Sequence, residues 1–277
     1  MDIKIIDSHQ HFWKYEPVKH DWIDEDMKVI RRDFYPADLS EVYNENQVMG
    51  CVAVQADQIE EETLFLLKIA RENDFVKGVV GWVDLRSPKI SERLDYFAQF
   101  TEIKGFRHVL QGEHPDFMLQ DAFLNGIGSL KDFDFTYDIL IFPQHLENSI
   151  KLAKQFPDQK FVVDHIAKPF IKMGEIVDWQ RNMEELGKLE NVSCKISGMI
   201  TEADYDHWTY EQLLPYLDVV LNAFGIQKVM FGSDWPVCLV AGKYEQVLGI
   251  VNKYFDTFTS AEKSAFFAEN ATAFYNL

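Results

Sequence analysis

The chain has 277 residues, of which 47% are hydrophobic and 14% aromatic. This composition supports a sizeable buried core, and the length fits one large α/β barrel or two ordinary domains. The formal net charge of −18 argues against nucleic acids and anionic membranes as partners, because both are bound through basic patches.

The three cysteines, Cys51, Cys194 and Cys238, are an odd number without the spacing of a metal site. Each lies in or near a β-rich run, so we expect buried free thiols and a reducing cytoplasmic location. We find no signal-peptide pattern at the N-terminus, and no apolar run approaches the ~20 residues that a membrane span needs. We therefore expect a cytoplasmic protein with no membrane partner, while a homo-oligomer remains open.

In chain order, short β-rich runs alternate with segments that have apolar residues at helical spacing. The eight β-rich runs are residues 3–8, 51–56, 76–83, 103–110, 136–142, 160–164, 191–196 and 228–232. Eight strand–helix units predict an α/β fold, a (β/α)8 TIM barrel. No linker interrupts the pattern, so we expect a single domain over residues 1–277. A capping-box pattern at Thr259 predicts a last helix to Tyr275 that completes the outer ring.

Two connections are longer than a minimal barrel needs. Residues 12–35, between the first strand and a helix expected near Pro36, are rich in aromatic side chains. Residues 111–119, after the fourth strand, are rich in Gly, His and Pro. Long loops at this end of a barrel usually cover the site, so we expect both to act as lids.

The first strand carries the most informative pattern, Asp7, His9 and His11 at alternate positions. Strand side chains alternate between faces, so these three are expected to point the same way. A strand that merely happens to carry histidines is the alternative interpretation. Asp234, after the last β-rich run, favours a site, because imidazoles plus a carboxylate are typical ligands of a divalent metal such as zinc.

Polar groups gather at the ends of the predicted strands, where barrel enzymes place their chemistry. These groups are His9 and His11, Gln55, Trp82 and Asp84, Arg107 and His108, Gln144 and His145, Asp164, His165 and Lys168, Ser197, and Asp234. Individually, His108 and His145 also fit packing histidines and Asp84 fits a helix cap; Glu113 is equally undecided.

Five ordered motifs make the chain resemble the lactonase branch of the amidohydrolase superfamily, most closely its sugar lactonases. They are Asp-x-His-x-His at 7–11, Gly-Phe-Arg-His-Val-Leu-Gln at 105–111, Val-Asp-His-Ile-Ala-Lys-Pro at 163–169, Cys-Lys-Ile-Ser-Gly at 194–198 and Phe-Gly-Ser-Asp-Trp-Pro at 231–236. The resemblance implies an active centre of His9, His11, His165 and Asp234. The tip of strand four carries Arg107 and His108 and no lysine that carbamylation would turn into a bridge between two metals. At most one metal is therefore expected, and the resemblance does not make it obligatory.

Ester hydrolysis needs an activated water and donors for the developing oxyanion. We expect one divalent metal, zinc, on His9, His11, His165 and Asp234, with Asp234 accepting the proton of water. The remaining predicted catalytic groups are His165, His108 and Arg107. The predicted substrate-binding residues are Trp13, Gln55, Trp82 and Lys168. Indoles and amides suit a neutral polyhydroxy ring.

Three functions remain open. The leading one is metal-dependent hydrolysis of a sugar lactone, such as L-fucono- or L-rhamnonolactone, in deoxysugar catabolism. The second is hydrolysis of a pyrone dicarboxylate or muconolactone, or decarboxylation of an aromatic acid. Such anions favour several arginines, whereas only Arg107 and Arg86 lie near strand ends. The third is a non-catalytic barrel, which predicts a damaged ligand set.

Overall fold

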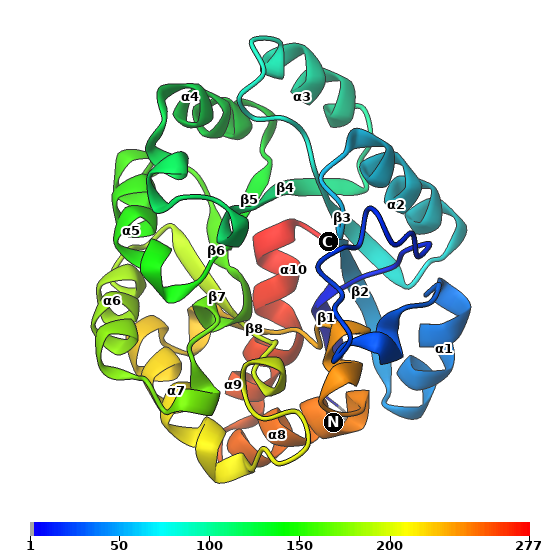
Figure 1. Ribbon diagram of the computed structural model, residues 1–277, viewed down its shortest axis with the longest axis vertical. Helices are drawn as coiled ribbons and strands as arrows, with labels where there is room; N and C mark the ends of the chain where they lie inside the picture. The colour runs from blue at the N-terminus through cyan, green and yellow to red at the C-terminus, as the bar shows by residue number, and fades with distance from the viewer. Residues whose placement is uncertain (1–2) are drawn as a thin grey trace.

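The computed structural model describes residues 3–277 of the chain, and its eight strands form one parallel sheet in the order of the sequence (Figure 1). The strands are β1 (Ile5–Gln10), β2 (Val48–Val54), β3 (Val76–Gly81), β4 (Ile103–Val109), β5 (Thr136–Leu140), β6 (Phe161–Val163), β7 (Val192–Ile196) and β8 (Val229–Phe231). Each predicted β-rich run overlaps one of them; β1 extends two residues beyond its predicted run, and β2 begins three residues before its run. The prediction of a TIM barrel is confirmed.

Helices follow the strands, and those that come before residue 255 form the outer ring in Figure 1. They are α1 (Pro36–Glu45), α2 (Glu60–Glu72), α3 (Ile90–Ala98), α4 (Asp121–Leu130), α5 (Leu146–Gln155), α6 (Val177–Gly187), α7 (Tyr210–Phe224) and α8 (Tyr244–Tyr254), followed by α9 (Ser260–Ser264) and α10 (Asn270–Tyr275). Helix α1 begins at Pro36 as expected, because proline at the first helical position gives up no hydrogen bond. Within residues 3–277, no helix is both long and apolar enough to cross a bilayer.

The barrel closes where β1 meets β8. A bridge pairs Gln10 with Trp235. The amide of His11 donates to the carbonyl of Trp235 at 2.7 Å, and the amide of Asp234 donates to the carbonyl of His9 at 2.8 Å. These bonds lie at the carboxyl ends of both strands. They therefore hold His9 and His11 directly beside Asp234.

The prediction that Asp7 points the same way as His9 and His11 is wrong. Asp7 pairs with Cys51 and Gln10 pairs with Ala53, so β1 has one extra residue between these pairs. Such a bulge changes the face on which the following side chains lie. Asp7 instead accepts hydrogen bonds from Tyr43 of α1 and Tyr244 of α8, at 2.9 and 3.3 Å. It holds the strand to the helical layer.

The expected place of the last helix is also wrong. Instead of one helix in the outer ring, a π-helical segment, Ala265–Glu269, joins α9 to α10. Helix α10 lies at the centre of the ring in Figure 1 and packs against lumen valines of β2, β3 and β6. Asn270 donates to the carbonyl of Val229, where β8 begins. The helix therefore covers the amino-terminal end of the barrel. The sequence did not predict this place, because helical periodicity shows that one face of a helix is buried but does not show which surface it packs against.

The long β1–α1 connection is packed rather than open. Trp13 pairs with Phe34 through backbone hydrogen bonds at 3.0 and 2.9 Å. Trp13, Phe34, Ile23 and Ile30 are all buried. The loop thus has an apolar core of its own beside the site. The three cysteines are free and buried, as predicted.

Candidate active site

The four residues predicted to form the active centre lie together at the carboxyl end of the barrel. The Nε2 atoms of His9 and His11 are 3.2 Å apart. Oδ1 of Asp234 lies 3.4 Å from His11 Nε2, 3.8 Å from His165 Nε2 and 4.0 Å from His9 Nε2. All four side chains are buried. Three imidazoles and one carboxylate therefore surround a single point.

This arrangement fits one divalent metal. Ligands about 2.1 Å from a tetrahedral ion lie about 3.4 Å from each other, close to the observed separations. Nδ1 of His11 is 2.7 Å from the carbonyl oxygen of Val54. A carbonyl only accepts, so Nδ1 carries the proton and the Nε2 lone pair is free for the site.

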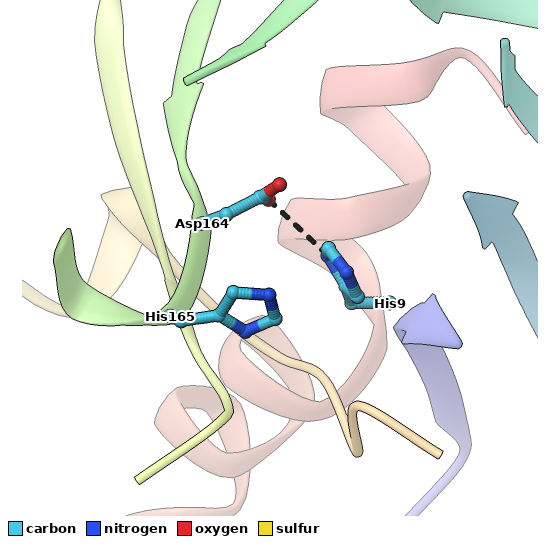
Figure 2. Close-up of side chains that lie close together, drawn as sticks. All are labelled: His9, Asp164 and His165. Carbon is cyan, nitrogen blue, oxygen red and sulfur yellow. Dashed lines mark ion pairs between the residues drawn. The ribbon is translucent and has the colours of Figure 1, made fainter. Parts of the chain in front are cut away.

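A second group, His9, Asp164 and His165, also brings three potential ligands together (Figure 2). Here Asp164 is already neutralised. Arg107 Nη1 lies 3.0 Å from its Oδ2, and Lys195 Nζ lies 3.0 Å from its Oδ1. Two cations beside the carboxylate oppose a further positive ion, so the group with His11 and Asp234 is the better metal site.

The turn after β6 presents His165 through an unusual backbone. Residues His165 to Lys168 have φ values of 53°, 48°, 60° and 47°, a left-handed turn without glycine. Each such residue costs roughly 1–2 kcal/mol, and strain of this kind is concentrated at functional sites. Ser197 Oγ holds Nδ1 of His165 at 2.9 Å. Nε2 of His165 is thereby directed toward Asp234.

Burial and neighbouring charge set the protonation of the site. Burial lowers the pKa of His9 and of His165 well below the usual value, so both rings are neutral at pH 7. Burial alone would raise the pKa of Asp234, but His165, His11 and Lys168 together hold it below its usual value. The centre therefore contains an ionised carboxylate, a proton acceptor, among neutral imidazoles.

Arg107 extends from β4 into the same centre. Its Nη1 is 3.2 Å from His9 Nε2, and its Nη2 donates to the Oε1 of Gln55 at 3.2 Å and to the backbone carbonyl of Gln55. The amide of Gln55 in turn donates to the carbonyl of Arg107 at 3.2 Å. Gln55 thus orients the guanidinium of Arg107. The predicted contact of Gln55 with substrate stays a prediction.

His108 lies apart from the four central side chains. Strand alternation places it on the face of β4 opposite Arg107. Its ring stacks on Phe117 at 4.9 Å, and its two nitrogens face Trp82 Nε1 at 3.4 Å and Glu113 Oε1 at 3.2 Å. Trp82 and His108 therefore form a pair beside the centre, and the structure does not bring this histidine to Asp234.

The other predicted residues lie around the rim. Trp13 is fully buried, with its ring centroid 6.3 Å from that of His11. Lys168 forms an ion pair with Glu202 at 2.6 Å. His145 contacts backbone oxygens of Phe142 and Glu113, which is the behaviour of a packing histidine.

The sequence analysis missed Lys195 and Asp138 as members of the site. Both are fully buried, and Lys195 Nζ lies 3.1 Å from Nδ1 of His9. A signal was present in β7, where Ser193, Lys195 and Ser197 alternate with Val192, Cys194 and Ile196. Period-two alternation places Lys195 on the same face as Ser197, which contacts His165.

Comparison with known proteins agrees with this geometry. The model of the family described as "Amidohydrolase" matches residues 6–277. The chain belongs to this family. It is 36% identical to an L-fucono-1,5-lactonase of Burkholderia multivorans, over 98% of this chain and 96% of that protein. An L-fucono-1,5-lactonase of Burkholderia ambifaria is 35% identical, over 98% and 95%.

A crystal structure of an amidohydrolase from Burkholderia multivorans with bound zinc superimposes with a TM-score of 0.95 at 36% identity, covering 99% of both chains. The predicted resemblance to the lactonase branch of the amidohydrolases is confirmed.

Proposed function

We propose that this amidohydrolase opens a sugar lactone, an aldonolactone such as L-fucono-1,5-lactone or L-rhamnonolactone, to the aldonic acid, and that it serves deoxysugar breakdown. The observation that carries the proposal is the ionised carboxylate of Asp234 facing the imidazoles of His9, His11 and His165. The two lactonase relatives, each covering nearly the whole chain, support the ester as the bond cleaved.

The reaction follows from these groups. Asp234 accepts a proton as water attacks the lactone carbonyl carbon. Arg107 and His165 donate toward the carbonyl oxygen as it gains negative charge. When the bond from the carbonyl carbon to the ring oxygen breaks, Asp234 returns the proton to the leaving alkoxide. The product acid then ionises and releases one proton to solvent.

We further propose that His9, His11 and Asp234, with His165 beside them, hold one zinc ion. When bound, it would act as a Lewis acid toward the carbonyl or lower the pKa of a water. The zinc-bound structure of the similar amidohydrolase supports this choice of metal.

A neutral substrate fits the charges around the centre. In the part of the chain that the structure describes, each cation close to the centre is already paired: Arg107 with Asp164, Lys195 with Asp138 and Asp164, and Lys168 with Glu202. A dicarboxylate would need to displace one of these partners. This observation disfavours the pyrone dicarboxylate alternative.

An acidic surface pocket of about 540 Å³ lies next to the Lys168–Glu202 pair. Its acidic lining residues are Asp24, Asp26, Glu202, Asp204 and Asp206. Lys172 also lines this pocket, and none of the four central side chains does, so the pocket is a surface feature beside the centre.

A substrate panel tests the proposal. Stereoisomeric aldonolactones, including L-fuconolactone and L-rhamnonolactone, are assayed with a pH indicator beside pyrone dicarboxylate and muconolactones at two salt concentrations. We expect kcat/KM to be highest for a six-carbon aldonolactone and to change little with salt. Removing or inverting one ring hydroxyl should cost about 1–3 kcal/mol, because a buried polar group is left unpaired. Preference for the dicarboxylate, with rates that fall steeply as salt rises, would overturn the proposal.

A further inference from the structure

Trp82 lies on the lumen side of the barrel mouth. Gly81, at the end of β3, faces the helical layer, because a Cβ there would collide with Thr63 of α2. Strand side chains alternate between faces, so Trp82 faces the lumen, on the same side as Val80. The residue is only half-buried. An aromatic ring in this place suits the wall of a small-molecule site, because such sites are lined by aromatic side chains and a few polar groups.

One contact sets the direction of the Trp82 indole. The backbone of Trp82 is fixed to α2, because its amide donates to Thr63 Oγ1 at 2.7 Å and its carbonyl accepts from the same hydroxyl at 2.8 Å. Within residues 3–277, the indole nitrogen has one hydrogen-bond partner, Nδ1 of His108 on the neighbouring strand β4, at 3.4 Å. The orientation of the ring therefore depends on His108.

The two hydrogen bonds of the His108 ring have a defined direction. An indole N–H only donates, so Nδ1 of His108 accepts from Trp82. Nε2 then carries the proton and lies 3.2 Å from Oε1 of Glu113, a carboxylate that accepts it. Burial lowers the pKa of His108 and keeps its ring neutral. A neutral ring is required here, since a doubly protonated imidazole has no acceptor for Trp82.

The loop between β4 and α4, which the sequence predicts as a lid, holds His108 in place. Glu113 and Phe117 both belong to this loop: the first accepts from Nε2 of His108, and the second stacks on its ring at 4.9 Å. The loop is tied to α5, because Asn148 donates to Asp116 at 3.0 Å. The predicted lid therefore fixes the ring that orients Trp82.

We propose that His108 is a positioning residue that holds the Trp82 indole as the wall against which the lactone ring packs, and that Glu113 sets the orientation of His108. This inference rests on the proposed function and assigns residues that determine how tightly the substrate binds. The indole packs against the sugar ring rather than the reacting bond, so it stabilises the ground state and the transition state alike. Loss of its orientation should therefore raise KM and leave kcat nearly unchanged.

Paired variants test these contacts. His108→Phe keeps a ring against Phe117 and removes both nitrogens. Glu113→Leu removes only the acceptor on the loop, and Glu113 is partly exposed, so this variant carries the test if His108→Phe folds poorly. Glu113→Gln is the conservative rescue, because it retains an oxygen that accepts from Nε2. The control is His207→Phe, the same substitution at an exposed histidine that contacts Asp204.

Each protein is measured in two ways. The indole N–H of Trp82 is followed in ¹H–¹⁵N spectra of the protein without substrate, and Trp82→Phe identifies its signal among those of the six tryptophans. Steady-state hydrolysis of the best lactone then gives kcat and KM separately. The spectrum reports the orientation of the indole, and the kinetics report what that orientation does for substrate.

We expect His108→Phe and Glu113→Leu to shift the indole signal and to raise KM on the order of tenfold, close to the net effect of one lost hydrogen bond, with kcat within about twofold of wild type. Glu113→Gln should regain most of the wild-type KM, and His207→Phe should match the wild type. An unshifted indole signal, an unchanged KM in the folded variants, or a fall in kcat alone would overturn the inference and leave the proposed function standing. A wild type that opens no lactone would overturn the proposed function and, with it, the role of the wall.

Discussion

Two of the four converging side chains sit on backbone that disfavours them. Asp234 has φ of 58° and His165 has φ of 53°. Each residue costs roughly 1–2 kcal/mol in this region, so the surrounding contacts must hold them there. For Asp234 these include the bond from its amide to His9, and for His165 the contact with Ser197. The proposed base, Asp234, is therefore placed by its backbone as much as by its side chain.

Replacing Asp234 with asparagine should remove the proton acceptor while leaving the fold intact. The side chain lies at the barrel mouth, and asparagine keeps its size. General acid–base groups contribute on the order of a hundred- to ten-thousand-fold, so kcat should fall within that range. The measurement is steady-state hydrolysis of the best lactone, with thermal unfolding to confirm the fold. Asp84→Asn is the control, since Asp84 accepts from the amide of Arg86 in an exposed turn. Activity of Asp234→Asn within a few-fold of wild type would show that another group is the base.

Gly198 protects the position of His165. A Cβ at this glycine would lie 2.7 Å from Nδ1 of His165, and its φ of 61° disfavours any side chain. Gly198→Ala should displace the imidazole and lower kcat by on the order of a hundredfold, the effect of a shift of about 1 Å. Gly112→Ala is the matched control, because no atom lies within 4 Å of its added methyl group. Equal kcat in the two variants would mean that the position of His165 is unimportant.

At the scale of elements, helix α2 contains a carboxyl group, that of Glu62, which titrates independently of the site. Glu62, in its first turn, accepts from the amide of Ala56 at 3.2 Å. Burial, reinforced by Asp57, raises its pKa from 4.5 to about 7. The protonated form is favoured in the folded state, so its contribution to stability is full below about pH 4.5 and is lost as the pH rises through about 7.

Glu62→Gln should therefore equal the wild type in stability at pH 4.5 and exceed it at pH 8. Each unit of pKa corresponds to 1.36 kcal/mol, and discounting for partial exposure leaves about 1–2 kcal/mol. Urea unfolding at both pH values measures the difference in free energy of unfolding, with exposed Glu61→Gln as the control. A wild type that is as stable as Glu62→Gln at pH 8 would contradict this assignment.

The elements also show what a sequence reveals about this fold. All eight strands could be predicted, because β-branched runs such as Val76–Gly81 are short and bounded by polar residues. The bulge in β1 could not, since one extra residue is defined only against its partner strand. The position of α10 could not either, because its buried face gives no indication of the surface that it covers.

The same limit applies to the site. His9, His11, His165 and Asp234 could be found because strand ends of a barrel meet at one mouth. Arg107 could be found for the same reason. Its neighbour His108 was wrongly assigned to the centre, because adjacent strand residues point to opposite faces and only one of the two can face it. Lys195 and Asp138 lie deeper in the lumen, where a sequence suggests apolar packing, so only their distances to His9 and to each other reveal them.

For the whole molecule, we expect one metal per chain. Elemental analysis of protein purified without chelator should find up to about one equivalent of zinc, since one complete ligand set is available. A second ion would have to displace Arg107 and Lys195 from Asp164. Two equivalents held at this site would contradict the single-metal prediction. Asp234→Asn alters one of the proposed ligands, so this variant should retain less zinc than Asp84→Asn.

The closure of the barrel between β1 and β8 also determines when the site can form during folding. The amide of Ser233 donates to Asp7 across a separation of 226 residues, and the bond from Asp234 to His9 spans a similar stretch. Contacts this distant in sequence form slowly, because most of the chain must be ordered before they are made. On a ribosome, His9 and His11 emerge early, whereas Asp234, the carboxylate that lies near both, is added only after β8 has been synthesised. Assembly of the proposed zinc site is therefore expected to be among the last events in the maturation of this enzyme.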